Sequence, residues 1–266
     1  GRSDRPAAVT DYDVIHLTDD LVGLLDVLGL ERAVFCGHDW GGIIVWRMAM
    51  LHPDRVAGVI ALNTPFQARG QRDLITTLRH VFGDQHYMVA FQQPQVPEAM
   101  FEQDVARVLG RMFRKPRSGN AVNLPPDQAA RMLTLDALTG SGPSGGTPFL
   151  PPEEFQVYVD TFRATGFGGG INWYRNMRRN WELMESVRQQ VDAPALMISA
   201  EHDLFLPPRL TDGMERWVPK VERQTIRDCG HWTQQEQPDQ VNALMIDWLH
   251  RWFRPVRGLE LRRGRR

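Results

Sequence analysis

The chain is poor in cysteine and has no long apolar run. Cys36 and Cys229 are the two cysteines among its 266 residues, and neither CxxC nor HExxH, the spacings typical of zinc sites, occurs. No apolar run approaches the roughly 18 residues of a transmembrane helix. A net charge of −1 offers no positive excess for nucleic acid or an anionic membrane. We therefore expect no metal, no cofactor, and no nucleic-acid or membrane partner, and we interpret the basic end, 261–266, as a solvated terminus.

Each cysteine lies near the end of an expected strand. Because those two strands are the first and last in the sequence, the Cα atoms should be further apart than the roughly 7 Å that a disulfide spans. We predict two buried, reduced thiols, which fits a reducing compartment such as the cytoplasm.

The most informative segment is 33–42, Ala-Val-Phe-Cys-Gly-His-Asp-Trp-Gly-Gly. A short apolar run stops at Gly37, Asp39 follows, and residues 43–46 open a helical pattern. This order is typical of a nucleophile elbow, Gly-x-Nu-x-Gly, with a carboxylate at the position of the nucleophile. The tight turn should require glycine at 37 and 41. The alternative is that Asp39 only caps the following helix.

The chain alternates strands with helices. Apolar runs predict strands at 33–37, 56–62 and 194–200, and we expect a fourth strand at 224–228. Leucines at helical spacing predict a helix over 14–28, and similar patterns predict helices over 40–51 and 241–252. Alternating elements favour an α/β fold with a mostly parallel, doubly wound sheet covered on both faces.

A long insertion separates the second and third strands. Residues 67–189 are too long for a loop, so we expect a small helical cap over the sheet edge, inserted into a core formed by 1–66 and 190–260. Cap helices are expected near 98–113, 126–136, 152–164 and 174–188, with a Pro/Gly/Ser-rich segment at 137–152 and no strands. Because an elbow usually ends a central strand, we also expect roughly 60–90 residues of the natural protein to precede this sequence.

The loops after the last two strands carry the remaining reactive groups. A carboxylate nucleophile needs a base to activate water and an acid to orient that base. Asp203 follows the third strand and His231 follows the fourth, in the usual order of nucleophile, acid and histidine. Glu201 is a second candidate for the acid. We interpret His38 as structural, because alternation along the strand turns its side chain away from Asp39.

Four motifs in this order carry a family resemblance. They are 37–42 (Gly-His-Asp-Trp-Gly-Gly), 62–66 (Leu-Asn-Thr-Pro-Phe), 172–176 (Asn-Trp-Tyr-Arg-Asn) and 228–232 (Asp-Cys-Gly-His-Trp). With them, the chain resembles the soluble epoxide hydrolases of the α/β-hydrolase fold over nearly its whole length. The resemblance implies that a small apolar epoxide is opened to a vicinal diol through an ester on Asp39, which water activated by His231 then hydrolyses. A homodimer is one possible assembly.

The resemblance also assigns further residues. Tyr87 and Tyr174 match the two cap tyrosines that act as acids in the family, which suits a phenol that stays protonated at neutral pH. The backbone N–H of Trp40 would be one oxyanion donor; the His-Gly-x-Pro loop that supplies the other is not found in the sequence. The implied substrate pocket is lined by Trp40, Thr64, Phe91, Leu204, Phe205 and Trp232, although core packing explains any single one of them.

Two other functions use the same residues. A haloalkane or haloacid dehalogenase would need the same Asp, His and acid, and a tryptophan after the nucleophile suits halide binding, but it has no need of paired phenols. A non-catalytic ligand-binding protein could keep the fold, although the intact set of Asp39, Asp203 and His231 argues against it.

Overall fold

The computed structural model describes residues 1–115, 132–141 and 145–253. Its main sheet has four parallel strands in the order β1-β2-β5-β6, namely β1 (Ala33–His38), β2 (Val56–Leu62), β5 (Ala195–Ala200) and β6 (Val221–Ile226). All four strands were predicted, but β6 begins and ends earlier than 224–228. β1 and β6 lie at opposite edges of this sheet.

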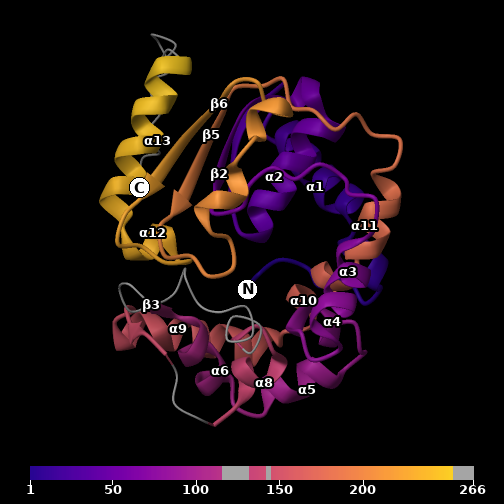
Figure 1. Ribbon diagram of the computed structural model, residues 1–266, viewed down its shortest axis with the longest axis vertical. Helices are drawn as coiled ribbons and strands as arrows, with labels where there is room; N and C mark the ends of the chain where they lie inside the picture. Colours follow the sequence, from indigo (N-terminus) through magenta and orange to yellow (C-terminus); the bar gives the residue numbers. More distant parts are fainter. Residues whose placement is uncertain (116–131, 142–144, 254–266) are drawn as a thin grey trace.

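Helices cover both faces of the sheet (Figure 1). α1 (Val14–Val27) and α2 (Trp40–Leu51) pack on one face, and α13 (Pro238–Trp252) packs on the other. Strand alternation divides the core accordingly: Ala195 and Met197 of β5 face α1 and α2, whereas Leu196 and Ile198 face α13. The predicted α/β architecture is confirmed for these elements.

The ends of the core helices follow from local chemistry. α1 begins at Val14 because the Asp13 carboxylate accepts hydrogen bonds from the backbone N–H groups of Ile15 and His16. α2 ends at Leu51, two residues before Pro53. The short core helices are η1 (Val9–Tyr12), η2 (Pro53–Arg55), η3 (Pro208–Thr211), η4 (Met214–Arg216) and α12 (Thr233–Glu236).

The insertion is largely helical and has its own apolar core. Its helices are α3 (Leu74–Phe82), α4 (Tyr87–Ala90), α5 (Val96–Glu102), α6 (Val105–Met112), α8 (Leu135–Thr139), α9 (Pro152–Thr165), α10 (Gly168–Arg175) and α11 (Met177–Leu183). Phe101, Val108 and Val159 are among the buried residues of a cluster separate from those of the sheet. We call the segment 67–189 the cap; Figure 1 shows its helices α4 to α9 beyond the carboxyl ends of the strands.

Several predicted boundaries in the cap were wrong. The single helix expected at 98–113 is two helices, because the Asp104 backbone is not helical, with φ −153° and ψ 80°, and its side chain caps α6 through the Arg107 N–H. The expected helix at 174–188 is replaced by α10 and α11, with α10 starting at Gly168 and α11 ending at Leu183. The patterns of α3 and α4 were missed. The expected helix at 126–136 falls mostly outside the described residues.

The cap also contains a strand pair that the sequence did not predict. β3 (Arg114–Lys115) pairs antiparallel with β4 (Thr147–Pro148). Two residues per strand carry too little apolar periodicity to be recognised. Arg114 fixes the pair through hydrogen bonds from its guanidinium to the backbone oxygens of Gly145 and Gly146.

Both cysteines are free, as predicted, but only one is buried. Cys229 lies under α13, whereas Cys36 is exposed. The prediction of burial was wrong for Cys36 because β1 lies at an edge of the described sheet, where one side of the strand has no neighbour.

Among the described residues, no helix is both long and apolar enough to cross a membrane. The basic end, 261–266, lies outside the described residues.

Candidate active site

Asp39 occupies the sharp turn between β1 and α2. Its backbone lies in the left-handed region, with φ 53° and ψ −118°, which residues other than glycine rarely adopt. Such strain is characteristic of functional positions. The Asp39 side chain makes no capping hydrogen bond to α2. The geometry therefore matches the predicted elbow and disfavours the alternative in which Asp39 is only a helix cap.

The glycine requirements of this turn differ from those expected. A Cβ on Gly37 would lie 2.1 Å from the Gly41 carbonyl oxygen, so position 37 must be glycine. A Cβ on Gly42 would lie 2.7 Å from the Thr64 Cβ, whereas one on Gly41 would meet no atom within 4 Å. The expectation was right for Gly37 and wrong for Gly41. It is the backbone carbonyl of residue 41 that approaches β1, while Gly42 allows α2 to approach β2.

His231 and Asp203 meet at the carboxyl edge of the sheet. The His231 Nδ1 lies 2.9 Å from the Asp203 Oδ2. Asp203 is 0% exposed, and its carboxylate also accepts from the Asn63 amide at 2.7 Å and from two backbone N–H groups of the same loop, at 205 and 206. Burial by itself would raise the pKa of Asp203, but the His231 charge and these hydrogen bonds hold the pKa below its usual value.

The other ring nitrogen of His231 faces Asp39. The His231 Nε2 lies 3.5 Å from the Asp39 Oδ2, and the Asp39 side chain is 38% exposed. Burial would lower the pKa of His231, but the charges of Asp203 and Asp39 outweigh it and raise the pKa to about 9. Glu201, the second candidate for the acid, instead accepts the backbone N–H of Asp228. The structure thus brings Asp203, and not Glu201, to His231.

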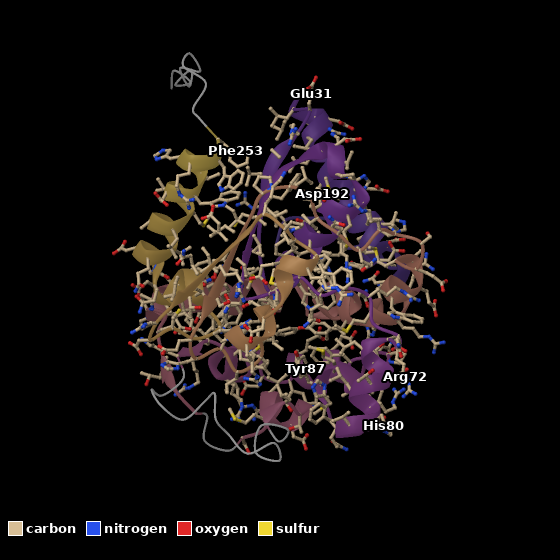
Figure 2. The ribbon with its side chains drawn as sticks, turned by 45° about the horizontal axis from the view of Figure 1, so that its top comes forward. Glu31, Arg72, His80, Tyr87, Asp192 and Phe253 are labelled. Atoms are coloured by element: carbon tan, nitrogen blue, oxygen red, sulfur yellow. The ribbon has the colours of Figure 1, made fainter. Side chains whose placement is uncertain are left out.

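The two tyrosines predicted as acids lie together in the cap, on α4 and α10. The ring centroids of Tyr87 and Tyr174 are 5.9 Å apart, and the two rings meet edge-on. Tyr87 lies where the cap meets the core (Figure 2). Burial raises the pKa of both phenols, and the Asp39 charge raises both further. Both side chains are therefore protonated at neutral pH. The Tyr174 ring lies 4.9 Å from the ring of Trp40, the residue that follows Asp39, which brings this pair close to the carboxylate.

Four of the six predicted pocket residues lie around these groups. Trp40 and Phe91 each meet the Tyr174 ring edge-on, at 4.9 and 5.0 Å between centroids. Phe205 is 41% exposed and its ring lies between those of Tyr87 and His231. The Thr64 hydroxyl donates to the Asp39 carbonyl.

The remaining two pocket residues stand apart from that group. Trp232 contacts the His231 ring, but its indole N–H is directed to the Met112 carbonyl in the cap, 2.7 Å away. Leu204 is half-buried beside Asp203, and its place in the pocket stays a prediction.

Several supporting residues were not predicted. Asn63 holds Asp203, Glu236 accepts two backbone N–H groups beside His231, and Arg175 ties the two tyrosine segments together. Asn63 and Arg175 lie inside the motifs noted above, and the positive φ of Asn63, 64°, marks it as unusual. Glu236 carries no such signal in the sequence.

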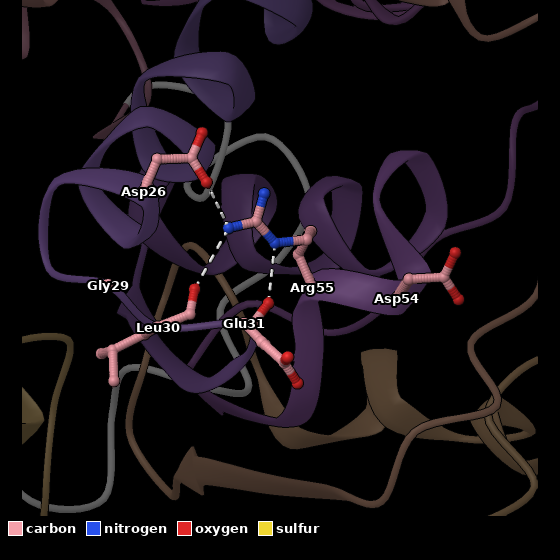
Figure 3. A pocket seen from close by; sticks show the side chains of 6 residues that line it. All are labelled: Asp26, Gly29, Leu30, Glu31, Asp54 and Arg55. Atoms are coloured by element: carbon pink, nitrogen blue, oxygen red, sulfur yellow. Dashed lines mark hydrogen bonds and ion pairs between the residues drawn. The ribbon is translucent and has the colours of Figure 1, made fainter.

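A separate hollow lies at the other end of β1 (Figure 3). It follows α1, near Leu30 and Glu31, and a strand the length of β1 places it about 20 Å from Asp39. Figure 2 shows Glu31 at the top of the molecule and Tyr87 well below it, in the lower half. The Arg55 guanidinium already donates to Asp26 and to the backbone oxygens of Leu30 and Glu31, so we assign no catalytic group there.

Comparison with known proteins agrees with this geometry. Residues 1–238 match the family model described as alpha/beta hydrolase fold. The chain is 38% identical to epoxide hydrolase A of Mycobacterium tuberculosis, covering 98% of this chain and 80% of that protein. The chain belongs to the epoxide hydrolase family of the α/β-hydrolase fold.

Other family members extend the comparison. The chain is 39% identical to bifunctional epoxide hydrolase 2 of Sus scrofa, over 94% of this chain but only 44% of that protein, so it spans less than half the length of that relative. The crystal structure of epoxide hydrolase A from Mycobacterium thermoresistibile superposes with a TM-score of 0.81 at 38% identity, covering 94% of this chain and 79% of the other. The family's α/β-hydrolase fold is thus found here by sequence and by structure.

Proposed function

We propose that this epoxide hydrolase family member opens an epoxide to a vicinal diol through an ester on Asp39. One observation carries the proposal: a partly exposed carboxylate in an elbow turn, 3.5 Å from a histidine, lies close to two buried phenols. The carboxylate and histidine alone would serve several reactions. The phenols add proton donors for an oxygen that stays in the product, as in epoxide opening.

In the first step, an Asp39 oxygen attacks a ring carbon of the epoxide. The carbon–oxygen bond of the ring breaks as the ester bond forms, and the developing alkoxide takes a proton from Tyr87 or Tyr174. Such general acid assistance typically contributes on the order of 10²–10⁴ in rate.

Formation of the ester prepares His231 for the second step. In the free enzyme, the Asp39 charge contributes to the raised pKa of His231, about 9, so the imidazole is protonated at neutral pH. The ester removes that charge and lowers the pKa. His231 then gives up its proton, which makes up for the proton that the phenol lost. The neutral imidazole can now act as a base.

In the second step, His231 takes a proton from water as the water oxygen bonds to the Asp39 carboxyl carbon. The backbone N–H of Trp40 is our candidate donor to the resulting oxyanion. When the intermediate collapses, the leaving oxygen of the diol takes the proton from the His231 imidazolium. The Asp39 carboxylic acid that remains then transfers its proton to His231. Asp203, buried and ionised, stabilises the imidazolium that forms.

The substrate is proposed to be a small apolar epoxide, because aromatic rings surround the reacting groups. Trp40, Phe91 and Phe205 lie nearest the tyrosines, and Thr64, Leu204 and Trp232 complete the proposed lining. Dehalogenation is less well supported, since it gives no role to the paired phenols of Tyr87 and Tyr174. The free thiols fit a cytoplasmic location, which we include in the proposal. A homodimer stays a prediction.

The test is one turnover of an aryl epoxide in water enriched with heavy oxygen. Diol formation with label appearing in the peptide that spans Asp39 is expected, because water attacks the ester at the Asp39 carboxyl carbon. Label in the diol and none in that peptide would mean direct attack of water on the epoxide. Release of halide from a bromoalkane, without diol formation, would favour a dehalogenase.

A further inference from the structure

The backbone on both sides of His231 is held by one carboxylate. Glu236, the last residue of α12, accepts the Gly230 N–H at its Oε2, 2.8 Å away, and the Trp232 N–H at its Oε1, 3.2 Å away. These two donors belong to the immediate neighbours of His231. Hydrogen bonds to a charged acceptor are roughly twice as strong as neutral ones, so Glu236 fixes the direction in which the loop presents the imidazole.

Two further contacts hold the same loop from the core. The buried Thr233 hydroxyl lies 2.7 Å from the Asn63 Oδ1 and 3.2 Å from the Gly230 carbonyl oxygen. The His38 Nε2 lies 2.7 Å from the His231 carbonyl oxygen, and since a carbonyl only accepts, His38 donates. These contacts are between neutral groups, whereas Glu236 also brings a charge to the loop.

The charge of Glu236 acts on His231 as well as on the backbone. Burial raises the pKa of Glu236, and the two backbone hydrogen bonds, the Lys115 ammonium and the His231 charge oppose that rise. In return, the Glu236 charge contributes to the raised pKa of His231, together with Asp203 and Asp39. Around this pair, the other titratable groups are His38 beside His231 and the Cys229 thiol beside Glu236.

We infer that Glu236 is a positioning residue for the hydrolysis half-reaction: it aims His231 at both Asp203 and the attacking water. This inference rests on the proposed function. The first half-reaction requires the Asp39 nucleophile and a phenol proton, neither of which Glu236 contacts. The second requires His231 to hold a fixed angle while it moves protons, and this is the geometry that the Glu236 carboxylate maintains.

The test separates the two half-reactions in the Glu236→Gln variant. Rapid quenching followed by intact mass would measure ester formation and ester decay across a pH series. We expect formation within about threefold of wild type and decay about 10-fold slower, since Gln accepts only one of the two N–H groups. The pH midpoint of decay should fall, because loss of the negative charge lowers the pKa of His231. A residue needed only for folding would not shift that midpoint.

The matched control is Asp239→Asn, which removes one negative charge three residues away, at the exposed start of α13. It should match wild type in both steps and in the pH midpoint. Decay of the Glu236→Gln ester at the wild-type rate and midpoint would overturn the inference, as would an equal loss in both half-reactions.

A second variant covers the case in which Glu236→Gln does not fold. Glu236→Asp keeps the charge and shortens the reach, so ester decay should slow while the pH midpoint stays unchanged. Decay at the wild-type rate in this variant would also overturn the inference. Failure of the proposed function is a different result, since wild-type protein would then form no ester from the epoxide.

Discussion

The two halves of the candidate site are held in place by different means. The core half is formed by Asp39, Asp203 and His231. They lie on loops at the ends of β1, β5 and β6, where the parallel strands fix the positions of the loops. The cap half is formed by Tyr87 and Tyr174. They lie on α4 and α10, short helices that are joined by side chains rather than by a common sheet.

Arg175 is central to the cap half. Its guanidinium donates to the backbone oxygens of Phe91 and Gln93, just after α4, and pairs with the Glu98 carboxylate. In the other direction, the Gln92 side chain donates to the Tyr174 carbonyl at 3.0 Å. Orientation of the phenols therefore depends on a few side chains that join short helices. In the core half, the strand ends set the positions, and Asn63 and Glu236 then fix Asp203 and the His231 loop. This contrast predicts that the two halves fail in different steps of the reaction.

The largest effect is expected in the core half, from His231→Gln. Without a base the ester should form and then persist, with decay slowed on the order of 10⁴-fold. Intact mass would show the protein heavier by one substrate molecule. If the variant stayed unmodified after incubation with an epoxide that wild type consumes, His231 would be needed in the first step. The proposed assignment of the two halves to different steps would then be wrong.

The corresponding variant in the cap half is the double substitution Tyr87→Phe and Tyr174→Phe. Ester formation should slow on the order of 10³-fold, because no phenol remains to protonate the alkoxide. Each single variant should retain part of the rate through the other hydroxyl. The measurement is ester formation under single-turnover conditions. A double variant as fast as either single one would show that the phenols are not the acids.

The sequence predicted the core half better than the cap half, for a physical reason. A strand end followed within a few residues by a reactive side chain is a local pattern, and parallel strands bring such ends to one edge. Asp39, Asp203 and His231 could be found in this way. Asn63 could not be assigned a role, since its partners Asp203 and Thr233 are 140 and 170 residues distant. Glu236 could not be assigned one because its contacts depend on the loop geometry.

The cap offered weaker signals. Its helices are short and amphipathic against one another, so the apolar pattern did not reveal that a break at Asp104 divides the helix expected at 98–113. Tyr87 and Tyr174 were found only through the family motifs, and nothing in the residues alone places their hydroxyls together. The Arg175 contacts that join their segments span more than 80 residues of sequence, a separation that no local pattern encodes.

A smaller and more specific effect is expected from Arg175→Met. The side chain is only 12% exposed, and methionine keeps much of its apolar stem while removing the hydrogen bonds to α4. Ester formation should slow about 10-fold as the tyrosines lose their alignment, while ester decay changes little, because His231 is held from the core. Arg178→Met is the control, since Arg178 is 72% exposed on α11 and pairs with Glu182. If Arg175→Met slowed decay as much as formation, the two halves would be mechanically coupled, and the separation argued from their different supports would be lost.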